Sequence, residues 1–300
     1  MPITPLSRRR FALIAGSALA APGARAQSDT GSASAMVDRI LRELGGEAPG
    51  NTADGFKAGD PNAPVHGIAT TAMATVEVLR QAVKAKTNLV LTYEPVFFSR
   101  ADRPATPGGR GPGGLDPEDP VYQAKKKFIE DNGLIVYRFH DRWQSQRQDD
   151  MVTALAGALG WGQHRVKRGD VLFDIPPATA EQVVADIRAR LKLNGGLRAV
   201  GDRTARVRRV LLHAGSMTPA IMWARYSEAD LIVAGEVREW ENTHFAADLL
   251  TAGEKHGLVT VGRVVSEDPG MQACSAWIKT IVKELPVQHF NAGDAYWRAV

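Results

Sequence analysis

Short apolar runs alternate with amphipathic stretches along most of the chain. Met73–Ala85 places apolar side chains at helical spacing, and Asn88–Thr92 follows as a continuous apolar run that is typical of a buried strand. The same patterns predict strands over Val65–Ala69, Gly133–Phe139, Val171–Ile175, Val207–His213, Leu231–Ala234, Leu258–Val261 and Val287–Phe290, and helices over Met36–Leu44, Tyr122–Asp131, Asp150–Leu159, Thr179–Leu191, Pro219–Tyr226, Thr243–His256 and Met271–Leu285. Apolar strands that alternate with helices indicate an α/β protein with mainly parallel, helix-covered sheets.

Local signals mark where some of these elements begin. Thr179, with Gln182 three residues later, predicts a capping box at the start of a helix, and Pro219 suits the first turn of another. Asn51–Asn62 and Ser99–Pro120 are rich in glycine, proline and aspartate, and we predict loops there.

Two further stretches concern domain organisation. Residues 27–35 are small and polar, which predicts a flexible leader. The segment 167–202 has a strand and a helix of its own, and we expect it to link two lobes of one domain over residues 36–298.

The N-terminus carries the features of an export signal. Residues 7–13 match the pattern S-R-R-x-F-x-L, a short apolar stretch follows, and Ala24 and Ala26 offer the small residues that a signal peptidase needs. The paired arginines favour the twin-arginine route, with an ordinary Sec signal as the alternative. The apolar stretch is roughly 12 residues, whereas a membrane span needs about 20. We therefore expect cleavage after Ala26 and a periplasmic protein without a membrane span.

Removal of this segment changes the charge balance. The chain has 37 Lys and Arg against 33 Asp and Glu, and residues 1–26 hold four arginines and no acid. The mature chain is therefore formally neutral, and nothing favours nucleic acid as a partner. Cys274 is the only cysteine, which excludes an internal disulfide and a cysteine-based zinc site.

Polar side chains follow four of the predicted strands. In open α/β sheets, ligands bind just beyond the carboxyl ends of the strands, so these side chains could converge on one site. Carboxylates with one imidazole suit Mg, Mn, Fe or Zn. The alternative is that each acid is a solvated loop residue. The candidates are Glu94, His140, Asp141, Glu236 and Glu267.

Five segments, in order, carry a resemblance to the Nif-three-like (GTP cyclohydrolase I type 2 homolog) family. They are GIATTAMATVEVLRQAVKAKTNLVLTYEPVFF, LIVYRFHDRWQ, IPPATAEQVVADIRARLKLNGGLRAVGDRTARVRRVLLHAGS, LIVAGEVREWENTHFAADLL and LVTVGRVVSEDPGM. The resemblance runs from about Met36 to Trp297. It implies a fold of intertwined α/β lobes, a homo-oligomer that is often a hexamer, and a divalent metal site of Zn, Mn or Fe, often dinuclear, that serves hydrolysis.

The chain departs from the family pattern at three positions. Tyr93 and Arg263 stand where the resemblance implies ligand histidines, and Gln144 stands where it implies His or Asp. Arginine stays cationic and cannot donate a lone pair to a metal. Arg263 could instead pair with Glu94 or Glu267 and take over the charge role of the ion.

Other family positions are kept. The resemblance implies metal ligands at Glu94, His140, Asp141 and Glu267, with His140 and Glu267 as catalytic residues. One ion held by Glu94, His140 and Glu267, with Asp141 behind His140, is the arrangement that these positions leave open.

Two functions follow, and they differ in whether a metal is kept. We favour a non-catalytic or weakly catalytic binding or assembly protein with an altered, metal-free site, whose ligand pocket includes Glu236, Trp240 and Arg263. The alternative is a divalent-metal-dependent hydrolase of unknown substrate, with a nucleotide-like compound as one candidate. Neither the small-molecule ligand nor the oligomer size can be read from the sequence.

Overall fold

Two five-stranded sheets and the helices that cover them make up the computed structural model, which describes residues 31–47, 49–99, 102 and 115–297. The predicted α/β class is confirmed. The predicted signal over 1–26 and most of residues 100–114 lie outside the described residues. No helix in the described part of the chain has the length and apolar character needed to cross a membrane.

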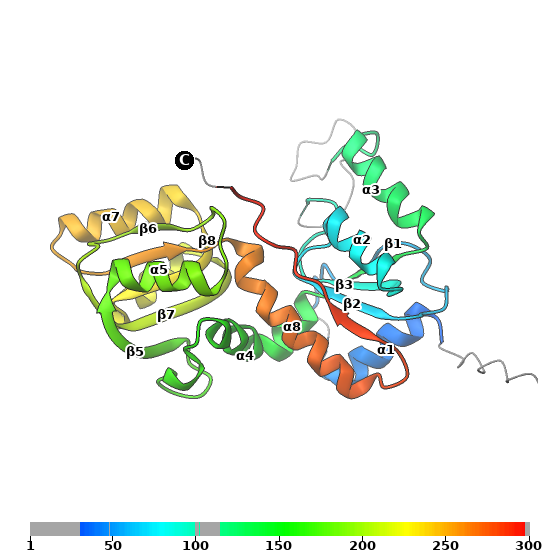
Figure 1. Cartoon of the computed structure of the whole chain (residues 1–300), viewed down its shortest axis with the longest axis horizontal. Helices are drawn as coiled ribbons and strands as arrows, with labels where there is room; N and C mark the ends of the chain where they lie inside the picture. The colour runs from blue at the N-terminus through cyan, green and yellow to red at the C-terminus, as the bar shows by residue number, and fades with distance from the viewer. Residues whose placement is uncertain (1–30, 48, 100–101, 103–114, 298–300) are drawn as a thin grey trace, which may run out of the picture. The chain divides into compact units, whose positions relative to one another are not determined.

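The first sheet has the strand order β1-β4-β3-β2-β10 (Figure 1). β2, β3, β4 and β10 run parallel, and β1 is an antiparallel edge strand. The two central strands are buried on both faces, as their continuous apolar runs predict. The bounds are Gly55–Ala58 for β1, Ile68–Thr71 for β2, Leu89–Thr92 for β3, Ile135–Arg138 for β4 and Val287–His289 for β10.

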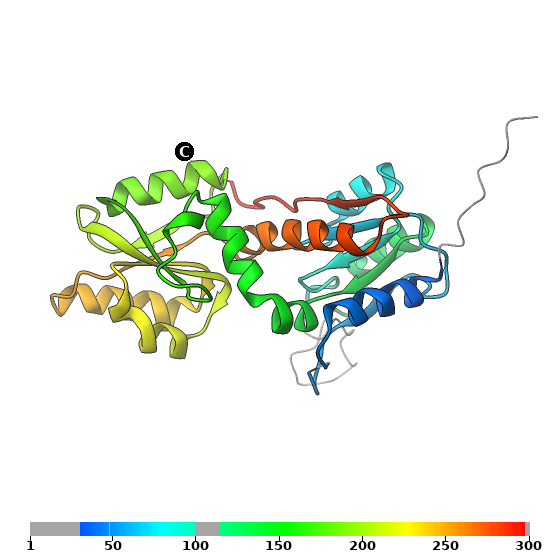
Figure 2. The same cartoon turned by 90° about the horizontal axis from the view of Figure 1, so that it is seen from below.

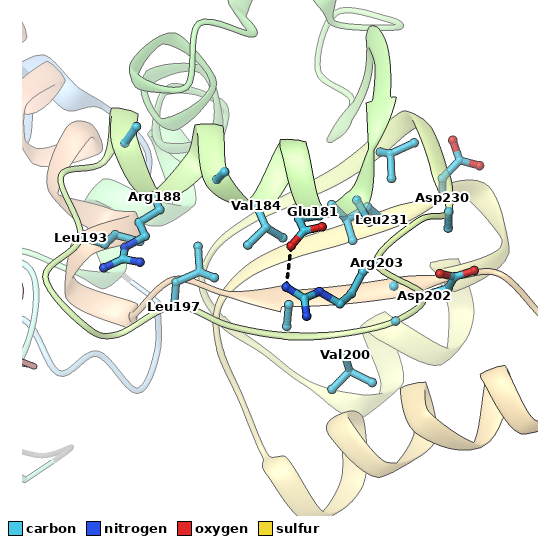
Figure 3. A pocket seen from close by; sticks show the side chains of 18 of the residues that line it. Glu181, Val184, Arg188, Leu193, Leu197, Val200, Asp202, Arg203, Asp230 and Leu231 are labelled. Carbon is cyan, nitrogen blue, oxygen red and sulfur yellow. Dashed lines mark hydrogen bonds and ion pairs between the residues drawn. The ribbon is translucent and has the colours of Figure 1, made fainter. Parts of the chain in front are cut away.

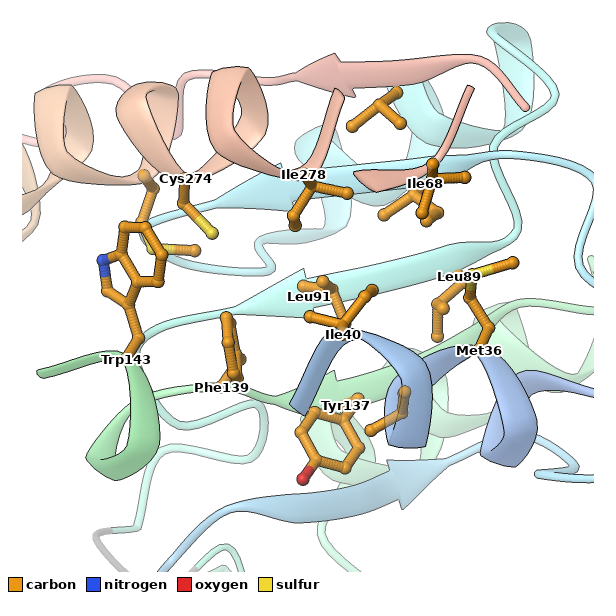
Figure 4. Close-up of a cluster of buried hydrophobic side chains, with 14 of the residues drawn as sticks. Met36, Ile40, Ile68, Leu89, Leu91, Tyr137, Phe139, Trp143, Cys274 and Ile278 are labelled. Carbon is orange, nitrogen blue, oxygen red and sulfur yellow. The ribbon is translucent and has the colours of Figure 1, made fainter. Parts of the chain in front are cut away.

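Helices cover both faces of this sheet. α2 (Val76–Lys84) and α3 (Pro120–Asp131) pack on one face, where Val90 of β3 points. Leu91 points to the opposite face, because successive strand side chains alternate. There it meets Ile40 of α1 (Ala33–Leu44) and Ile278 of α8 in the cluster of Figure 4.

The second sheet has the order β5-β7-β8-β9-β6, with three parallel central strands and an antiparallel strand at each edge. α5 (Ala180–Arg190) packs on one face, and α6 (Pro219–Arg225) and α7 (His244–Thr251) pack on the other. The strands are Leu172–Thr179 for β5, Arg198–Val200 for β6, Arg206–Met217 for β7, Leu231–Val237 for β8 and Gly257–Thr260 for β9. The segment 167–202 contributes β5, α5 and β6.

Two long helices join the sheets. α8 (Arg263–Ile281) contacts β2 and β10 of the first sheet and β7 and β8 of the second, and α4 (Asp141–Ala158) packs along it (Figure 2). The two helices approach closely at Gly270, where a Cβ would lie 2.1 Å from Sδ of Met151. α8 is continuous at this point, although Pro269 lies inside the helix.

Several predicted boundaries were wrong, while the caps were right. α8 begins at Arg263 rather than Met271, and α4 begins at Asp141 rather than Asp150. β1 lies in a predicted loop, and β6 was missed because it is a three-residue edge strand. The capping box at Thr179 and the first-turn position of Pro219 are confirmed. α1 begins at Ala33, inside the predicted leader.

Candidate functional site

The Arg263 guanidinium lies among three carboxylates. Its Nε is 2.9 Å from Oε1 of Glu94 and 3.3 Å from Oε1 of Glu267, and its Nη2 is also 2.9 Å from Oε1 of Glu94. Its Nη1 is 3.2 Å from Oε1 of Glu236. Four residues that the sequence singled out therefore meet at one point, which we call the Arg263 cluster (Glu94, Glu236, Arg263 and Glu267).

Strand ends position each member of this cluster. Glu94 follows β3, and its backbone N–H donates to the carbonyl of Ala72 at 2.8 Å. Glu236 lies near the end of β8. Arg263 opens α8 directly after β9, and Glu267 follows one helical turn later on the same face. The helix predicted over Met271–Leu285 thus begins eight residues earlier, at Arg263.

Two glycines make room for the first turn of α8. Gly215 of β7 has φ +81°, and a Cβ there would lie 2.7 Å from Oε1 of Glu267. A Cβ at Gly235 of β8 would lie 2.3 Å from Oγ of Ser266. That hydroxyl accepts the N–H of Gly215 at 2.8 Å and donates to the carbonyl of Arg263 at 2.6 Å. The sequence analysis missed this close packing of the two glycines against α8. A glycine near the end of an apolar strand nevertheless signals that another part of the chain approaches the backbone closely.

Burial and charge set the protonation states in the cluster. Burial, and then the Glu94 carboxylate, raise the pKa of Glu267 well above its ordinary value, although Arg263 acts in the opposite direction. Burial lowers the pKa of Arg263, but Glu94, Glu267 and Glu236 together raise it above its ordinary value, so it stays cationic. Burial, Glu267 and Glu94 raise the pKa of Tyr93, whose phenol is therefore neutral.

His140 and Asp141 lie beside Tyr93. Nδ1 of His140 is 2.9 Å from Oδ1 of Asp141, and the imidazole and phenol ring centroids are 4.2 Å apart. Asp141 also accepts the N–H of Ala53 at 2.6 Å and the hydroxyl of Thr52 at 3.1 Å. Burial raises the pKa of Asp141, but these bonds and His140 lower it below its ordinary value. Within the described part of the chain, no hydrogen bond or ion pair joins His140 to the Arg263 cluster.

Two other candidates lie apart from these contacts. Gln144 is exposed, and its backbone N–H donates to the carbonyl of His140 at 2.8 Å as part of α4. Trp240 lies in a π-helix, Glu239–Thr243, and is 70% exposed. Its ring faces the guanidinium of Arg238, 5.9 Å from the ring centroid. Trp240 is therefore a surface aromatic residue.

The Arg263 cluster does not fit a divalent ion in this arrangement. A guanidinium contacts the carboxylates that would act as ligands, and it has no lone pair to donate. A divalent ion beside it would also meet a like charge. Among residues 31–47, 49–99, 102 and 115–297, no three His, Cys, Asp or Glu side chains are arranged to hold a metal ion.

A comparison with protein-family models identifies the family. Residues 48–291 match Duf34/NIF3 (NGG1p interacting factor 3). The chain belongs to the Duf34/NIF3 family. The match covers both sheets and every member of the Arg263 cluster. The resemblance to the Nif-three-like family is therefore confirmed. No curated protein matches the chain at a significant level.

Solved structures of this fold come from several organisms. Protein SA1388 of Staphylococcus aureus has a TM-score of 0.66 at 15% identity, over 90% of this chain and 99% of that one. A Bacillus cereus protein related to NIF3 has a TM-score of 0.65 at 14% identity, over 91% and 100%. Reduced HcgD from Methanocaldococcus jannaschii has a TM-score of 0.54 at 14% identity, over 86% and 97%. At these identities the likeness shows that the Duf34/NIF3 fold is shared.

Proposed function

We propose that this Duf34/NIF3 protein is a binding or assembly protein, non-catalytic or weakly catalytic, in which an arginine takes the place of a divalent metal. The observation that carries the proposal is the position of Arg263, whose guanidinium contacts Glu94, Glu236 and Glu267. A permanent cation therefore stabilises the acidic side chains that an ion would otherwise hold together.

The charges in the cluster support a stable, metal-free arrangement. Glu94 is 6% exposed, and Arg263 lies on it with two nitrogens at 2.9 Å. Glu267 is 2% exposed, and its raised pKa favours the neutral acid, which limits the number of buried charges. The guanidinium contacts both buried acids of the cluster, and a divalent ion would have to displace it to bind.

The part of the cluster that solvent can reach suits a small polar ligand. About half of the Glu236 side chain and a third of the Arg263 side chain are exposed, so the cluster presents one carboxylate and part of one guanidinium. The carboxylate can accept charge-assisted hydrogen bonds from a polar ligand, and the guanidinium can donate them. We propose that a ligand binds there without a chemical step.

One observation favours the second candidate, a divalent-metal-dependent hydrolase of unknown substrate. Asp141 accepts at Nδ1 of His140, which leaves Nε2 as the free ring nitrogen. A metal-binding histidine commonly donates its other ring N–H to a carboxylate, which fixes the orientation of the ring. A metal site would need Arg263 to move away and Glu94, His140 and Glu267 to come together, since no three such side chains of the described residues are arranged to hold an ion.

Metal analysis distinguishes the two candidates. We expect untagged wild-type protein to contain far less than one Zn, Mn or Fe per chain by mass spectrometry, and to hydrolyse nucleotides no faster when these metals are added. Tyr93→His/Arg263→His should gain about one ion per chain, because imidazole donates a lone pair where guanidinium cannot. Arg263→Lys, which keeps the charge, is the matched control and should stay metal-poor. One metal ion per wild-type chain that Glu267→Ala abolishes would instead establish the hydrolase.

Export and assembly complete the proposal. We propose that residues 1–26 direct twin-arginine export and are cleaved after Ala26, so that the protein works in the periplasm as a homo-oligomer, a hexamer by family resemblance. Arg8→Lys/Arg9→Lys should abolish export, and N-terminal sequencing of periplasmic protein should begin at Gln27. Light scattering of the mature protein measures the oligomer. Export that persists in the double variant would indicate the Sec route.

A further inference from the structure

A pocket of about 1010 Å³ lies between α5 and β6, at the edge of the second sheet and away from the Arg263 cluster (Figure 3). Its volume is at the upper end of the range for small-molecule sites. Its apolar lining includes Val184 of α5, Val207 of β7 and Leu231 of β8, with Leu193 and Leu197 from the turn that follows α5. None of its described lining residues is aromatic. The pocket therefore suits an aliphatic body rather than a stacked nucleobase.

The acidic residues of the pocket are already engaged. Oε1 of Glu181 is 2.5 Å from Nη2 of Arg203, the pair drawn with a dashed line in Figure 3. Asp202 accepts the N–H and the hydroxyl of Thr204 at 2.8 and 2.7 Å. Asp230 accepts two backbone N–H groups, at 2.8 Å each. Glu181 is therefore paired with a cation, whereas Asp202 and Asp230 are held by uncharged donors.

Two cations at one end of the pocket are not engaged. In the part of the chain that the structure describes, neither Arg188 nor Lys192 forms an ion pair or a side-chain hydrogen bond. Arg188 lies near the end of α5, beside Leu193, and Lys192 follows the helix. The charge that the pocket offers to a ligand is therefore positive at this end, and it complements an anion.

The neighbouring loop already holds a carboxylate. Oδ2 of Asp294 accepts the backbone N–H groups of Asn194, Gly195 and Gly196 at 3.0, 3.2 and 3.3 Å. Successive N–H groups that point to one spot form a natural anion seat. Asp294 already fills this seat, so a ligand carboxylate would depend on Arg188 and Lys192 rather than on these N–H groups.

We infer that this pocket is a second ligand site, which takes an aliphatic carboxylate. The aliphatic chain lies against Val184, Leu197 and Leu231, and the carboxylate lies at Arg188 and Lys192. The inference is independent of the Arg263 cluster, and either can fail without the other.

Calorimetric titration of the mature protein with decanoate tests the inference. We expect one saturable site per chain with a Kd below about 100 μM. Decyltrimethylammonium, which has the same chain and the opposite charge, should bind at least about tenfold more weakly. Arg188→Ala should weaken decanoate binding about tenfold, because it removes one charge-assisted contact. Arg190→Ala is the matched control on α5, since Arg190 pairs with Asp186 outside the pocket, and it should bind as the wild type does.

A second variant tests the pocket without touching charge. Ala185 is exposed and lines the pocket, so Ala185→Trp should block decanoate while the fold, measured by circular dichroism, stays intact. No wild-type binding up to about 1 mM, equal binding of the cationic probe, or loss in Lys255→Ala but not Arg188→Ala would each overturn the inference. A change of oligomeric state in Ala185→Trp without any decanoate binding would show that a second copy covers the pocket, which also overturns it.

Discussion

Arg263 and Glu267 lie one turn apart at the start of α8, with Nε of Arg263 3.3 Å from Oε1 of Glu267. One residue of this pair is a permanent cation and the other is a buried acid whose pKa is raised well above its ordinary value. The guanidinium of Arg263 also pairs with Glu94 and Glu236, so we expect the stability of this part of the fold to depend on it.

Removal of the cation should destabilise the fold through Glu94. We expect Arg263→Met to lower the free energy of unfolding by about 2 kcal/mol, which is less than for a fully buried pair because 34% of the Arg263 side chain is exposed. Adding Glu94→Gln to Arg263→Met should restore much of the loss, because the uncompensated buried charge is then gone. Urea unfolding of the two single variants and the double variant measures this coupling. Additive effects of the two substitutions would contradict the ion pair.

Glu267 should give the fold a distinctive pH dependence. Its folded pKa is raised above the ordinary 4.5, so between these values the folded state holds a proton that the unfolded state has lost. The free energy of unfolding should therefore fall as pH rises above about 4.5 toward the folded pKa. Glu267→Gln, which keeps the shape and stays neutral, should flatten this decline. Denaturant unfolding from pH 4 to 8 measures it, and a Gln variant with the wild-type slope would assign the decline to another group.

We expect position 215 to require glycine for two reasons: its positive φ, and the close approach of the Glu267 side chain. Gly215→Ala meets both a φ of +81° and a contact of 2.7 Å with Glu267, whereas Gly253→Ala meets a φ of +90° with nothing within 4 Å. We expect Gly253→Ala to cost about 1 kcal/mol from strain alone and Gly215→Ala to cost at least about twice as much. Thermal unfolding of the two variants compares them. Equal losses of stability in the two variants would mean that the Glu267 side chain moves aside at no cost in free energy.

Asp294 should hold the C-terminal segment on the loop after α5. Asp294→Ala should speed amide hydrogen exchange at Asn194, Gly195 and Gly196, because their acceptor is gone. Asn291→Ala is the control, since among the described residues its side chain bonds only Gly293 of the same segment. Burial raises the pKa of Asp294, but the backbone N–H groups hold it below its ordinary value of 3.8. The contact should therefore persist above about pH 4 and weaken as pH falls through the lower folded pKa.

Some features could be predicted from the sequence because they depend on neighbours along the chain. Thr179 and Gln182 are three residues apart and form a capping box at the start of α5. The box uses only the side chains and backbone N–H groups of these two residues, so it does not depend on the rest of the fold. The strand Leu89–Thr92 is apolar throughout, and Glu94 follows it directly. The order of most elements and the residues at the strand ends could therefore be predicted from the sequence.

Other features depend on contacts between distant segments. Pro269 and Gly270 indicate a helix end in the sequence, but α8 runs through both, and Gly270 leaves room for Met151 of α4. The part of α8 before Pro269 brings Arg263 and Glu267 onto one helical face. The pocket beside α5 was not foreseen either, since its lining comes from segments that are far apart in the chain.

The sequence by itself determined that an arginine stands where the family resemblance implies a metal ligand, together with the acids that could surround it. This was possible because charge and lone pairs are properties of the residue type. Only the tertiary structure decided which acids the guanidinium meets and which of them has a raised pKa. Those outcomes depend on burial and on distances between Glu94, Glu236, Arg263 and Glu267, which three strand ends and one helix start bring together.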